Sequence, residues 1–418
     1  MKILFLTAYF SPEQAASPYL GENRNQAFAD AGFDMVVYTP IPTRGITNEI
    51  RQEYKKKKHE VFFDGKMNVY RFNLIGEKKN PVLRAWRYTM SCVKQFVKGT
   101  FAKDARSCDI MFISSTPPIQ GAMAALVKKV RRIPLVYNLQ DIFPDSLVGT
   151  GLAKKDGLLW KIGRVIENFT YRNADKIIVI SQDFKRNIMA KGVPEEKIEV
   201  IYNWVDEQAV VHIPRAENKL FEKYNLDSKK FYITYCGNIG LTQNMDLLLD
   251  VAKELSAEEN IHFVLVGEGA DKARVQSRVE NEKINNISFL PFQPYEDISH
   301  VFSLGNAGLI ISKPGVGENS VPSKTWSIMS AECPVIANFD ENEIKTILTE
   351  NSCGIFTKAG DREAFKNAIL ELYNDREKAV RLGKNGRQFI MENLTREIGT
   401  SKYVEVVKKV FEEKCNKK

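Results

Sequence analysis

Short apolar runs alternate with helical segments along the chain, and this alternation restricts the possible fold more than any other feature. In the first half, runs such as Ile3–Ala8, Asp109–Ser114 and Leu135–Leu139 have the length of buried strands. Strands separated by helices predict a parallel, doubly wound sheet, whose ligands bind at the carboxyl ends of the strands. The other elements expected in this half are the strands Met35–Tyr38, Val69–Phe72 and Lys176–Ser181 and the helices Gly21–Ala31 and Gln120–Val130.

The pattern restarts after residue 206, where a polar and basic stretch without clear periodicity extends to Lys230. A chain of 418 residues is too long for one typical core, so we expect two domains of the α/β class. They comprise residues 1–206 and 207–385, followed by a helical segment, residues 386–418, that crosses back to the first domain. The strands expected in the second half are Phe231–Cys236, His262–Val266, Ile287–Leu290, Ala307–Ile311, Val335–Ala337 and Gly354–Phe356. The helices expected there are Asn244–Leu255 and Arg362–Tyr373. The last segment, Ala379–Lys414, should form two helices that separate near Asn393-Leu394-Thr395.

Charge and cysteine content limit the possible partners. The formal net charge of +8 favours an anionic partner. The six cysteines include no C-x-x-C pair and the four histidines are far apart, so we expect a reduced, cytosolic protein without a metal site. No apolar stretch approaches the ~18 residues of a membrane span. The apolar start runs into Ser11-Pro12-Glu13 without a cleavage site, which favours a first strand over a signal peptide.

The stretch Glu318–Ala337 combines a turn, a helix start and a strand. It begins with the turn-prone residues Glu318, Asn319 and Ser320, passes through Pro322-Ser323-Lys324, and then becomes apolar at helical spacing. Free backbone N–H groups at a helix start attract anions, and Lys324 adds a full positive charge beside them. An ordinary capped core helix is the alternative, but Pro, Ser and Lys together favour an anion site.

Three further loops follow expected strands. The loop Gln140–Asp145 holds two carboxylates, Asp141 and Asp145, one of which could act as a general base or orient a hydroxyl. Capping of the next helix is the alternative role of these residues. The glycine-bearing turns Gly237–Gly240 and Gly267–Gly269 would let a ligand approach the backbone.

The helix expected at Pro81–Lys103 has an apolar face surrounded by positive charge. The apolar residues are Leu83, Trp86, Met90, Val93, Val97 and Phe101, and the basic residues are Arg84, Arg87, Lys94, Lys98 and Lys103. Such a helix can lie on an anionic membrane, with Arg84, Trp86, Arg87, Lys94 and Lys98 as docking residues. Packing of the stripe against the domain's own core explains the pattern equally well, so both interpretations stay open. The basic run Lys55–Lys58 is interpreted as a solvated loop.

Several stretches together resemble the retaining glycosyltransferases of family 4, which have the GT-B fold, and more narrowly their WbuB- and WcaI-like bacterial branch. The N-terminal markers are SPEQAASPYLGENRNQAFADAGFDMVVYTP, NLQDIFPDSLVGTG and ADKIIVISQDFKRNIMAKGVPEEKIEVIYNWVD. The C-terminal markers are YCGNIGLTQNMDLLLD, FVLVGEGADK and SVPSKTWSIMSAECPVIA. Their order and spacing extend the resemblance over essentially the whole chain.

The resemblance implies two Rossmann-like domains that face each other across a cleft. The C-terminal domain would hold a nucleotide-activated sugar and the N-terminal domain an acceptor. It also implies retention of anomeric configuration, no protein nucleophile and no metal cofactor, since basic side chains and helix starts stabilise the leaving diphosphate. The implied donor contacts are Gly237, Asn238, Gly240, Gln243, Glu268, Phe292, Glu318, Asn319, Ser320, Val321, Ser323 and Ser327, with Asp141 and Lys324 as catalytic residues and Ser17 and Asp145 on the acceptor side.

This chain departs from the family pattern at four donor positions. Asn238 and Gln243 stand where many members carry Arg and Lys. Asn319 and Ser327 stand where relatives have two glutamates eight residues apart, although Glu318 lies next to the first. A water could bridge the shorter Ser327 side chain to a ribose hydroxyl. The departures leave Lys324, with help from Lys313, as the positive charge expected to neutralise the diphosphate.

The function implied by the resemblance is assembly of a bacterial O-antigen or capsule repeat. The donor would be UDP-linked, and the branch suggests a deoxy-amino sugar such as N-acetyl-L-fucosamine. The acceptor would be a polyprenyl-diphosphate-linked saccharide, used by a peripheral protein on the inner face of the cytoplasmic membrane. A sugar-nucleotide 2-epimerase of the same architecture is the alternative enzyme, and it would need no acceptor. Nucleic-acid binding is not favoured, because no stretch resembles a recognition helix or an aromatic RNA-binding sheet.

Overall fold

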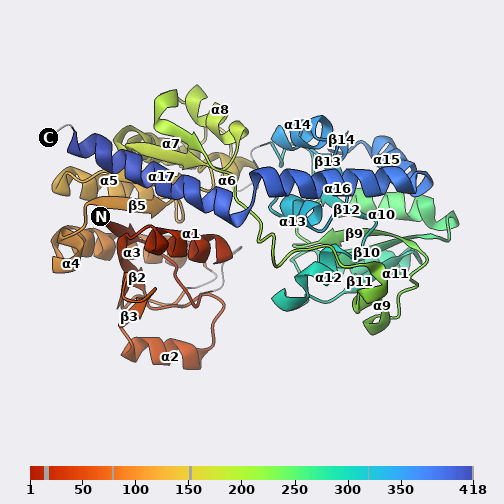
Figure 1. Ribbon diagram of the computed structural model, residues 1–418, viewed down its shortest axis with the longest axis horizontal. Coiled ribbons are helices and arrows are strands. Elements are labelled where there is room, and N and C mark those ends of the chain that lie inside the picture. The colour runs from red at the N-terminus through yellow and green to blue at the C-terminus, as the bar shows by residue number, and fades with distance from the viewer. Residues whose placement is uncertain (14–17, 78–79, 150–152, 319, 417–418) are drawn as a thin grey trace. The chain divides into compact units, whose positions relative to one another are not determined.

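The computed structural model describes residues 1–13, 18–77, 80–149, 153–318 and 320–416, which form two compact units (Figure 1). Unit 1 comprises Met1–Tyr202 and Gly399–Lys418, and unit 2 comprises Asn203–Ile398. The chain thus passes from unit 1 to unit 2 between residues 202 and 203 and returns between residues 398 and 399. The sequence analysis placed these boundaries after residues 206 and 385. Each unit is an α/β domain around its own sheet, as predicted.

Unit 1 contains an eight-stranded sheet in the order β3-β4-β2-β1-β5-β6-β7-β8. Neighbouring strands are parallel except for β3 and β4. The strands are β1 (Lys2–Leu6), β2 (Asp34–Pro40), β3 (His59–Phe62), β4 (Met67–Phe72), β5 (Ile110–Ser114), β6 (Leu135–Leu139), β7 (Lys176–Val179) and β8 (Ile198–Val200). The strand order reverses at β1, so the carboxyl ends of β1 and β5 form the topological switch point.

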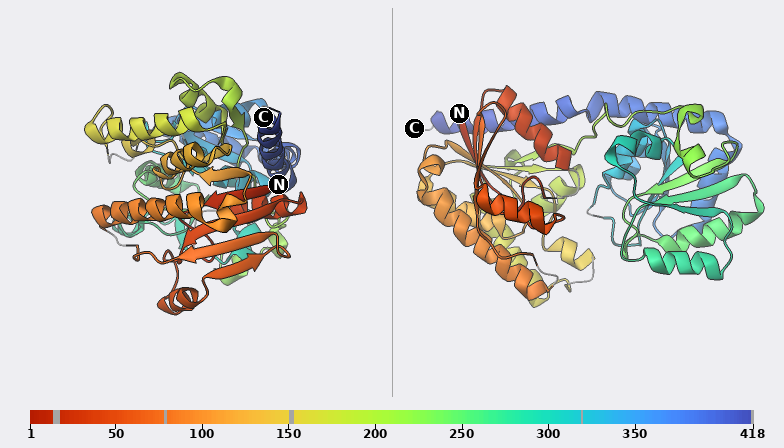
Figure 2. Two further views of the ribbon diagram at one scale, coloured as in Figure 1. Left: turned by 90° about the vertical axis from the view of Figure 1, so that its left-hand side faces the viewer. Right: turned by 90° about the horizontal axis from the view of Figure 1, so that it is seen from below.

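The helices of unit 1 cover both faces of this sheet. They are α1 (Pro18–Asp30), α2 (Asn48–Lys56), α3 (Pro81–Phe101), α4 (Lys103–Arg106), α5 (Gln120–Arg131), α6 (Asp145–Gly149), α7 (Leu158–Asn173), α8 (Gln182–Ala190) and most of α17 (Arg396–Cys415). The crossovers that contain α3, α5 and α7 run in one direction along the sheet, so right-handed connections place these helices on one face. Figure 2 shows them side by side, and α5 packs between the other two.

The other face of the sheet is covered by α1 and α17. Phe28 of α1 and Tyr403 of α17 both contact Phe112 of β5, with ring centroids 5.8 and 5.9 Å from it. The Tyr403 hydroxyl also donates to Oδ1 of Asn138 on β6, over 3.1 Å. The end of the chain is thereby fixed to the N-terminal sheet.

Unit 2 contains a six-stranded parallel sheet in the order β11-β10-β9-β12-β13-β14. Its strands are β9 (Phe231–Cys236), β10 (Ile261–Val266), β11 (Ile287–Leu290), β12 (Ala307–Ile311), β13 (Val335–Phe339) and β14 (Gly354–Lys358). Counted along the unit, this is the Rossmann order 3-2-1-4-5-6, with the switch point between β9 and β12. Both of these strands are buried throughout, which explains their continuous apolar sequences.

The helices of unit 2 are α9 (Leu220–Lys223), α10 (Met245–Glu254), α11 (Lys272–Asn281), α12 (Ile298–Phe302), α13 (Lys324–Ser330), α14 (Glu343–Glu350), α15 (Arg362–Asn374) and α16 (Arg376–Asn393). The predicted break between the last two helices of the chain is confirmed, since α16 ends at Asn393 and α17 begins at Arg396. The prediction of a solvated loop at Lys55–Lys58 is wrong in part, because α2 extends to Lys56. None of the α2 side chains is buried, so the helix lacks the apolar stripe that would have predicted it.

Candidate active site

Two glycine-bearing loops meet at the switch point of unit 2. The backbone N–H of Ile239 in the β9–α10 loop donates to the carbonyl of Glu268, and that of Asp271 donates back to the carbonyl of Ile239, over 2.9 and 3.0 Å. A Cβ on Gly267 would lie 1.9 Å from the Gly237 carbonyl oxygen, and one on Gly269 would lie 2.1 Å from that of Ile239. Gly267 and Gly269 are therefore required for the two loops to approach each other. The sequence analysis had instead given these glycines the role of letting a ligand approach the backbone.

Lys324 lies at the centre of this switch point. It is the first residue of α13, and its Nζ lies 3.8 Å from the centroid of the Tyr235 ring on β9. A Cβ on Gly237 would be 3.3 Å from the same Nζ. Burial lowers the pKa of Lys324 to about 8, and no carboxylate among the described residues offsets this effect. The fold thus holds an unpaired cation where parallel α/β sheets bind ligands.

Helix α16 fixes the position of α13 from behind. A Cβ on Gly383 would lie 2.0 Å from the carbonyl oxygen of Glu332, in the turn after α13, so only glycine lets α16 approach this turn so closely. The guanidinium of Arg387 donates to the carbonyl and the hydroxyl of Ser330, at the end of α13, over 3.0 and 2.6 Å. These contacts set the direction in which α13 presents Lys324.

The loop that precedes Lys324 is fixed by the turn after β13. The carboxylate of Asp340 accepts bonds from the N–H groups of Gly315 and Gly317, over 2.9 and 2.7 Å. The amide of Asn342 donates to the carbonyls of Gly317 and Ser320, over 3.1 and 3.0 Å. The sequence analysis missed Asp340 and Asn342. Their position directly after a buried strand, at the edge where ligands bind, is the signal that could have identified them.

The two residues that replace expected cations, Asn238 and Gln243, lie together in the β9–α10 loop. The amide of Asn238 lies 3.5 Å from Oε1 of Gln243, which also accepts the N–H of Gly240 over 3.1 Å. Gln243 therefore orders the loop backbone, whereas a lysine would supply charge. The N–H of Lys313, after β12, donates to the Thr242 carbonyl over 2.9 Å and ties this loop to the neighbouring one.

The remaining donor predictions lie on loops around this edge. Glu268 is exposed and pairs with Lys272 over 2.6 Å, while Phe292 is 75% exposed, so its ring is free to stack on a planar group. Ser323 precedes α13 as its N-cap position but makes no side-chain cap bond. Glu318 is exposed, and Val321 and Ser327 are partly exposed. Ser320 donates to the Gly317 carbonyl over 3.2 Å, and Asn319 lies outside the described residues.

In unit 1, the two carboxylates after β6 have opposite environments. Desolvation and the nearby charge of Asp145 raise the pKa of Asp141, although the residue is exposed and Ser146 donates to its Oδ2 over 3.1 Å. Burial also acts on Asp145, but the Lys191 ammonium at 2.8 Å and the Asn187 amide at 3.1 Å hold its pKa below the usual range. Lys191 in turn pairs with buried Glu167, so Asp145 belongs to a structural network. Ser17, also assigned to the acceptor side, lies outside the described residues.

Helix α3 places most of the predicted docking residues at its surface. Its stripe includes Trp86, 57% exposed, and does not pack against the core of unit 1. Arg84 is exposed, while Lys94 donates to the Asn73 carbonyl over 2.7 Å and Lys98 lies 5.7 Å from the Tyr38 ring centroid. The assignment of Arg87 to a docking surface is wrong. Its side chain is fully buried, donating to the Ile75 carbonyl and the Thr43 hydroxyl, so it anchors the helix.

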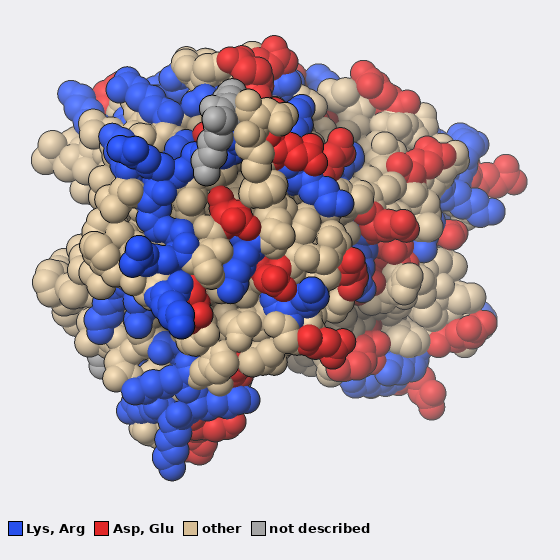
Figure 3. Space-filling model, turned by 60° about the vertical axis from the view of Figure 1, so that its left-hand side comes forward, with Lys and Arg blue, Asp and Glu red and all other residues tan. Residues whose placement is uncertain are grey.

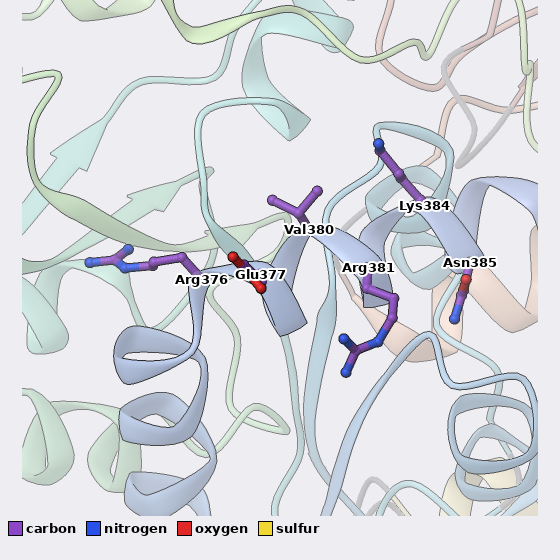
Figure 4. Close-up of a pocket in the computed structure, with 6 residues that line it drawn as sticks. All are labelled: Arg376, Glu377, Val380, Arg381, Lys384 and Asn385. Carbon is purple, nitrogen blue, oxygen red and sulfur yellow. The ribbon is translucent and has the colours of Figure 1, made fainter.

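A surface cavity of about 450 Å³ lies away from these loops, along α16. Figure 4 shows the six residues that line it, Arg376, Glu377, Val380, Arg381, Lys384 and Asn385, on successive turns of that helix. None of them is a predicted donor residue. Within the described residues, no group of three His, Cys, Asp or Glu side chains is arranged to hold a metal ion. None of the helices formed by these residues combines the length and apolar character needed to cross a bilayer.

Comparison with known proteins agrees with this architecture. Residues 25–209 match the family model Glycosyltransferase Family 4, and residues 216–389 match Glycosyl transferases group 1. The fold resembles that of Alr3699/HepE of Anabaena in complex with UDP, with a TM-score of 0.72 at 17% identity over 98% of this chain and 100% of that one. The protein is therefore an α/β enzyme of the GT-B class. It belongs to the glycosyltransferases that combine these two family domains.

Two curated relatives are similar in sequence. WcaI of Escherichia coli (strain K12), whose name assigns it to colanic acid biosynthesis, is 28% identical over 208 residues, 49% of this chain and 51% of WcaI. The chain thus spans about half the length of WcaI. WbjE of Pseudomonas aeruginosa, named as a probable glycosyltransferase, is 24% identical over 310 residues, 74% of this chain and 76% of WbjE.

Proposed function

We propose that the protein transfers a sugar from a UDP-linked donor to a polyprenyl-diphosphate-linked saccharide, with retention of anomeric configuration, in bacterial O-antigen or capsule synthesis. The observation that carries the proposal is the unpaired Lys324 cation at the switch point of unit 2, beside a glycine turn. A leaving diphosphate supplies the negative charge that this lysine lacks. Retention, like the acceptor class, rests on the family resemblance.

Lys324 and Asp141 have different roles in this proposal. The bond between the anomeric carbon and the leaving phosphate oxygen breaks, and a bond to the acceptor oxygen forms. The acceptor proton passes to the leaving phosphate, so no protein nucleophile is required. Lys324 stabilises the charge that develops on the diphosphate, and the Gly237–Gly240 backbone lies beside it. Asp141, whose pKa is raised by desolvation and by the charge of Asp145, contacts the donor sugar in this proposal.

The comparisons support the donor and the pathway class. The Anabaena neighbour binds UDP in its structure, and another structure of the same protein contains UDP-glucose. The name of WcaI refers to colanic acid biosynthesis, and that of another relative, WclY of Escherichia coli, to O-antigen biosynthesis. The narrower suggestion of N-acetyl-L-fucosamine as the donor sugar rests on the sequence motifs of the branch. We also propose that no metal cofactor is needed, so EDTA treatment should leave turnover unchanged.

The proposed location is the inner face of the cytoplasmic membrane, where the lipid-linked acceptor resides. The exposed apolar stripe of α3 and the adjacent Arg84 support this location. The remaining docking residues in this proposal are Trp86, Lys94 and Lys98.

The test is thermal-shift screening with UDP, GDP and ADP, since a ligand that binds the folded state raises the apparent stability by mass action. UDP should raise the unfolding temperature more than GDP or ADP at equal concentration. Incubation with UDP-sugars, with and without a polyprenyl-diphosphate saccharide, then separates transfer from 2-epimerisation. Conversion of the UDP-sugar alone would favour the epimerase, and absence of any nucleotide effect would contradict the donor proposal.

A further inference from the structure

Helix α7, far from α3 in sequence, has an equally apolar exposed surface. Leu158, Leu159, Ile162 and Val165 are 76%, 62%, 50% and 69% exposed. Their spacing places them along one side of the helix. On the neighbouring α5, Leu126 and Val130 are 47% and 56% exposed. Because α5 packs between α3 and α7, the outer surfaces of the three helices lie next to one another in unit 1, and we term them together the three-helix face.

The charge of the three-helix face is almost entirely positive. The helices carry four basic residues on α3, three on α5 and three on α7, of which Arg87 is buried and Lys128 is paired with Asp175. Their only acidic residue is Glu167, which is buried and paired with Arg164 and Lys191. Among the basic residues, Arg84, Lys129, Lys161 and Arg172 are exposed. Figure 3 shows lysine and arginine side chains gathered along one side of the view, among uncharged surface atoms.

We propose that the three-helix face binds an anionic phospholipid bilayer, with α7 as a second lipid-contacting helix beside α3. Exposed branched apolar side chains surrounded by Lys and Arg match the acyl boundary and the anionic headgroups of such a surface. A second copy of the chain fits less well, because two faces with the same positive charge repel each other. The proposal deepens the peripheral location given above, since it assigns the membrane contact to three helices.

The test is co-sedimentation of the full-length protein with vesicles of phosphatidylcholine alone or mixed with phosphatidylglycerol. Wild type should bind the anionic vesicles at least tenfold more tightly. The variant Leu158→Ser/Ile162→Ser/Val165→Ser should lose at least tenfold in the ratio of bound to free protein. The variant Lys129→Gln/Lys161→Gln should lose about fivefold per charge removed. All five side chains are exposed, so the fold should be retained.

The control variant is Val380→Ser/Met391→Ser on α16, which removes apolar side chains of similar exposure, 57% and 47%, from unit 2. It should bind vesicles within twofold of wild type. Unchanged binding of the α7 variant, or an equal loss in the control, would overturn the proposal. A wild-type dimer that the α7 substitutions convert to a monomer, together with no vesicle binding, would assign the face to a second copy instead.

The same variants separate this proposal from the donor-site proposal. The three-helix-face variants should keep the wild-type thermal shift with UDP, because their substitutions lie in unit 1 and the donor loops lie in unit 2. Lys324→Ala should keep wild-type vesicle binding. A wild type that binds vesicles but shows no shift with UDP would therefore refute the donor site and leave the three-helix face supported.

Discussion

Lys324 and Asp145 are both charged, partly buried side chains at the carboxyl edge of a parallel sheet, but the fold satisfies only one of them. In unit 1, Asp145 accepts bonds from Lys191 and Asn187, and its pKa is lowered despite burial. In unit 2, Lys324 has a Tyr235 ring below it and no carboxylate partner among the described residues, and its pKa falls to about 8. The charged form of Asp145 is stabilised within its own unit, whereas burial destabilises the charged form of Lys324.

This difference separates structural from functional charge. A charge that the fold has already paired contributes to stability and has little capacity left for a ligand. A charge that the fold leaves unpaired costs stability and is available to stabilise an anion that forms during a reaction. The comparison predicts that removal of Lys324 mainly lowers activity and that removal of Asp145 mainly lowers stability.

The largest effect is expected for Lys324→Ala. Turnover should fall by on the order of 10²-fold or more, because the variant loses the cation that the proposed mechanism uses to stabilise the leaving diphosphate. The measurement is steady-state turnover with a UDP-sugar and acceptor, together with circular dichroism to establish the fold. Lys345→Ala on α14 is the control, since Lys345 also lies near an aromatic ring, 5.9 Å from the centroid of Phe356. Unchanged turnover of Lys324→Ala would mean that another group neutralises the diphosphate.

Asp145→Ala should instead destabilise unit 1, by about 2 kcal/mol, because it leaves the Lys191 ammonium with one partner fewer. The native pKa of Asp145 is lowered, so its contribution is present above the unfolded pKa of about 4 and is lost as the pH falls through the native pKa. Denaturant unfolding of wild type and variant at pH 7 and pH 3 measures this. The difference should be large at pH 7 and shrink at pH 3, and a difference independent of pH would contradict an ionic role.

Much of the fold could be predicted from the sequence, because buried parallel strands need continuous apolar runs. The strand β9 was predicted with its observed bounds, Phe231–Cys236, and β12 with Ala307–Ile311. The helix α2 and the strand β3 were not predicted. Neither consists of an apolar run: α2 buries no residue, and β3 lies at the edge of the sheet. Elements that bury little leave little pattern in the sequence.

The site was less predictable, because charge type does not show where a side chain points. Arg84 and Arg87 lie three residues apart on α3, yet Arg84 is exposed and Arg87 is fully buried, where it donates to the Ile75 carbonyl and the Thr43 hydroxyl. Asp141 and Asp145 are similar in sequence context, but only Asp145 is reached by Lys191, which comes from the end of α8. Such pairings depend on contacts between residues distant in sequence, which local spacing does not contain.

Asp141 lies between Lys324 and Asp145 in this comparison. Asp141→Asn should have a smaller effect than Lys324→Ala or Asp145→Ala. We expect about a tenfold loss of turnover with little change in UDP affinity, because the substitution keeps the shape but removes the charge that the proposed mechanism places at the donor sugar. Steady-state kinetics combined with calorimetric titration of UDP separates the two quantities. Ser146→Ala, which removes only the hydroxyl donated to Asp141, is the control and should change turnover less. Equal losses of rate and UDP affinity would make Asp141 a structural residue.

The smallest effect tests the cost of leaving Lys324 unpaired. In the ligand-free protein, Lys324→Met should raise the stability by on the order of 1 kcal/mol at pH 7, since it removes a buried charge and keeps most of the side-chain volume. The native pKa is lowered from 10.5 to about 8, so the penalty is complete below pH 8 and disappears as the pH rises toward 10.5. Unfolding temperatures of wild type and variant from pH 7 to pH 10 should therefore converge. Lys345→Met, on a side chain that is 45% exposed, should show no such convergence. A destabilised Lys324→Met variant at pH 7 would show that the Tyr235 ring already compensates the charge, and the contrast with Asp145 would then disappear.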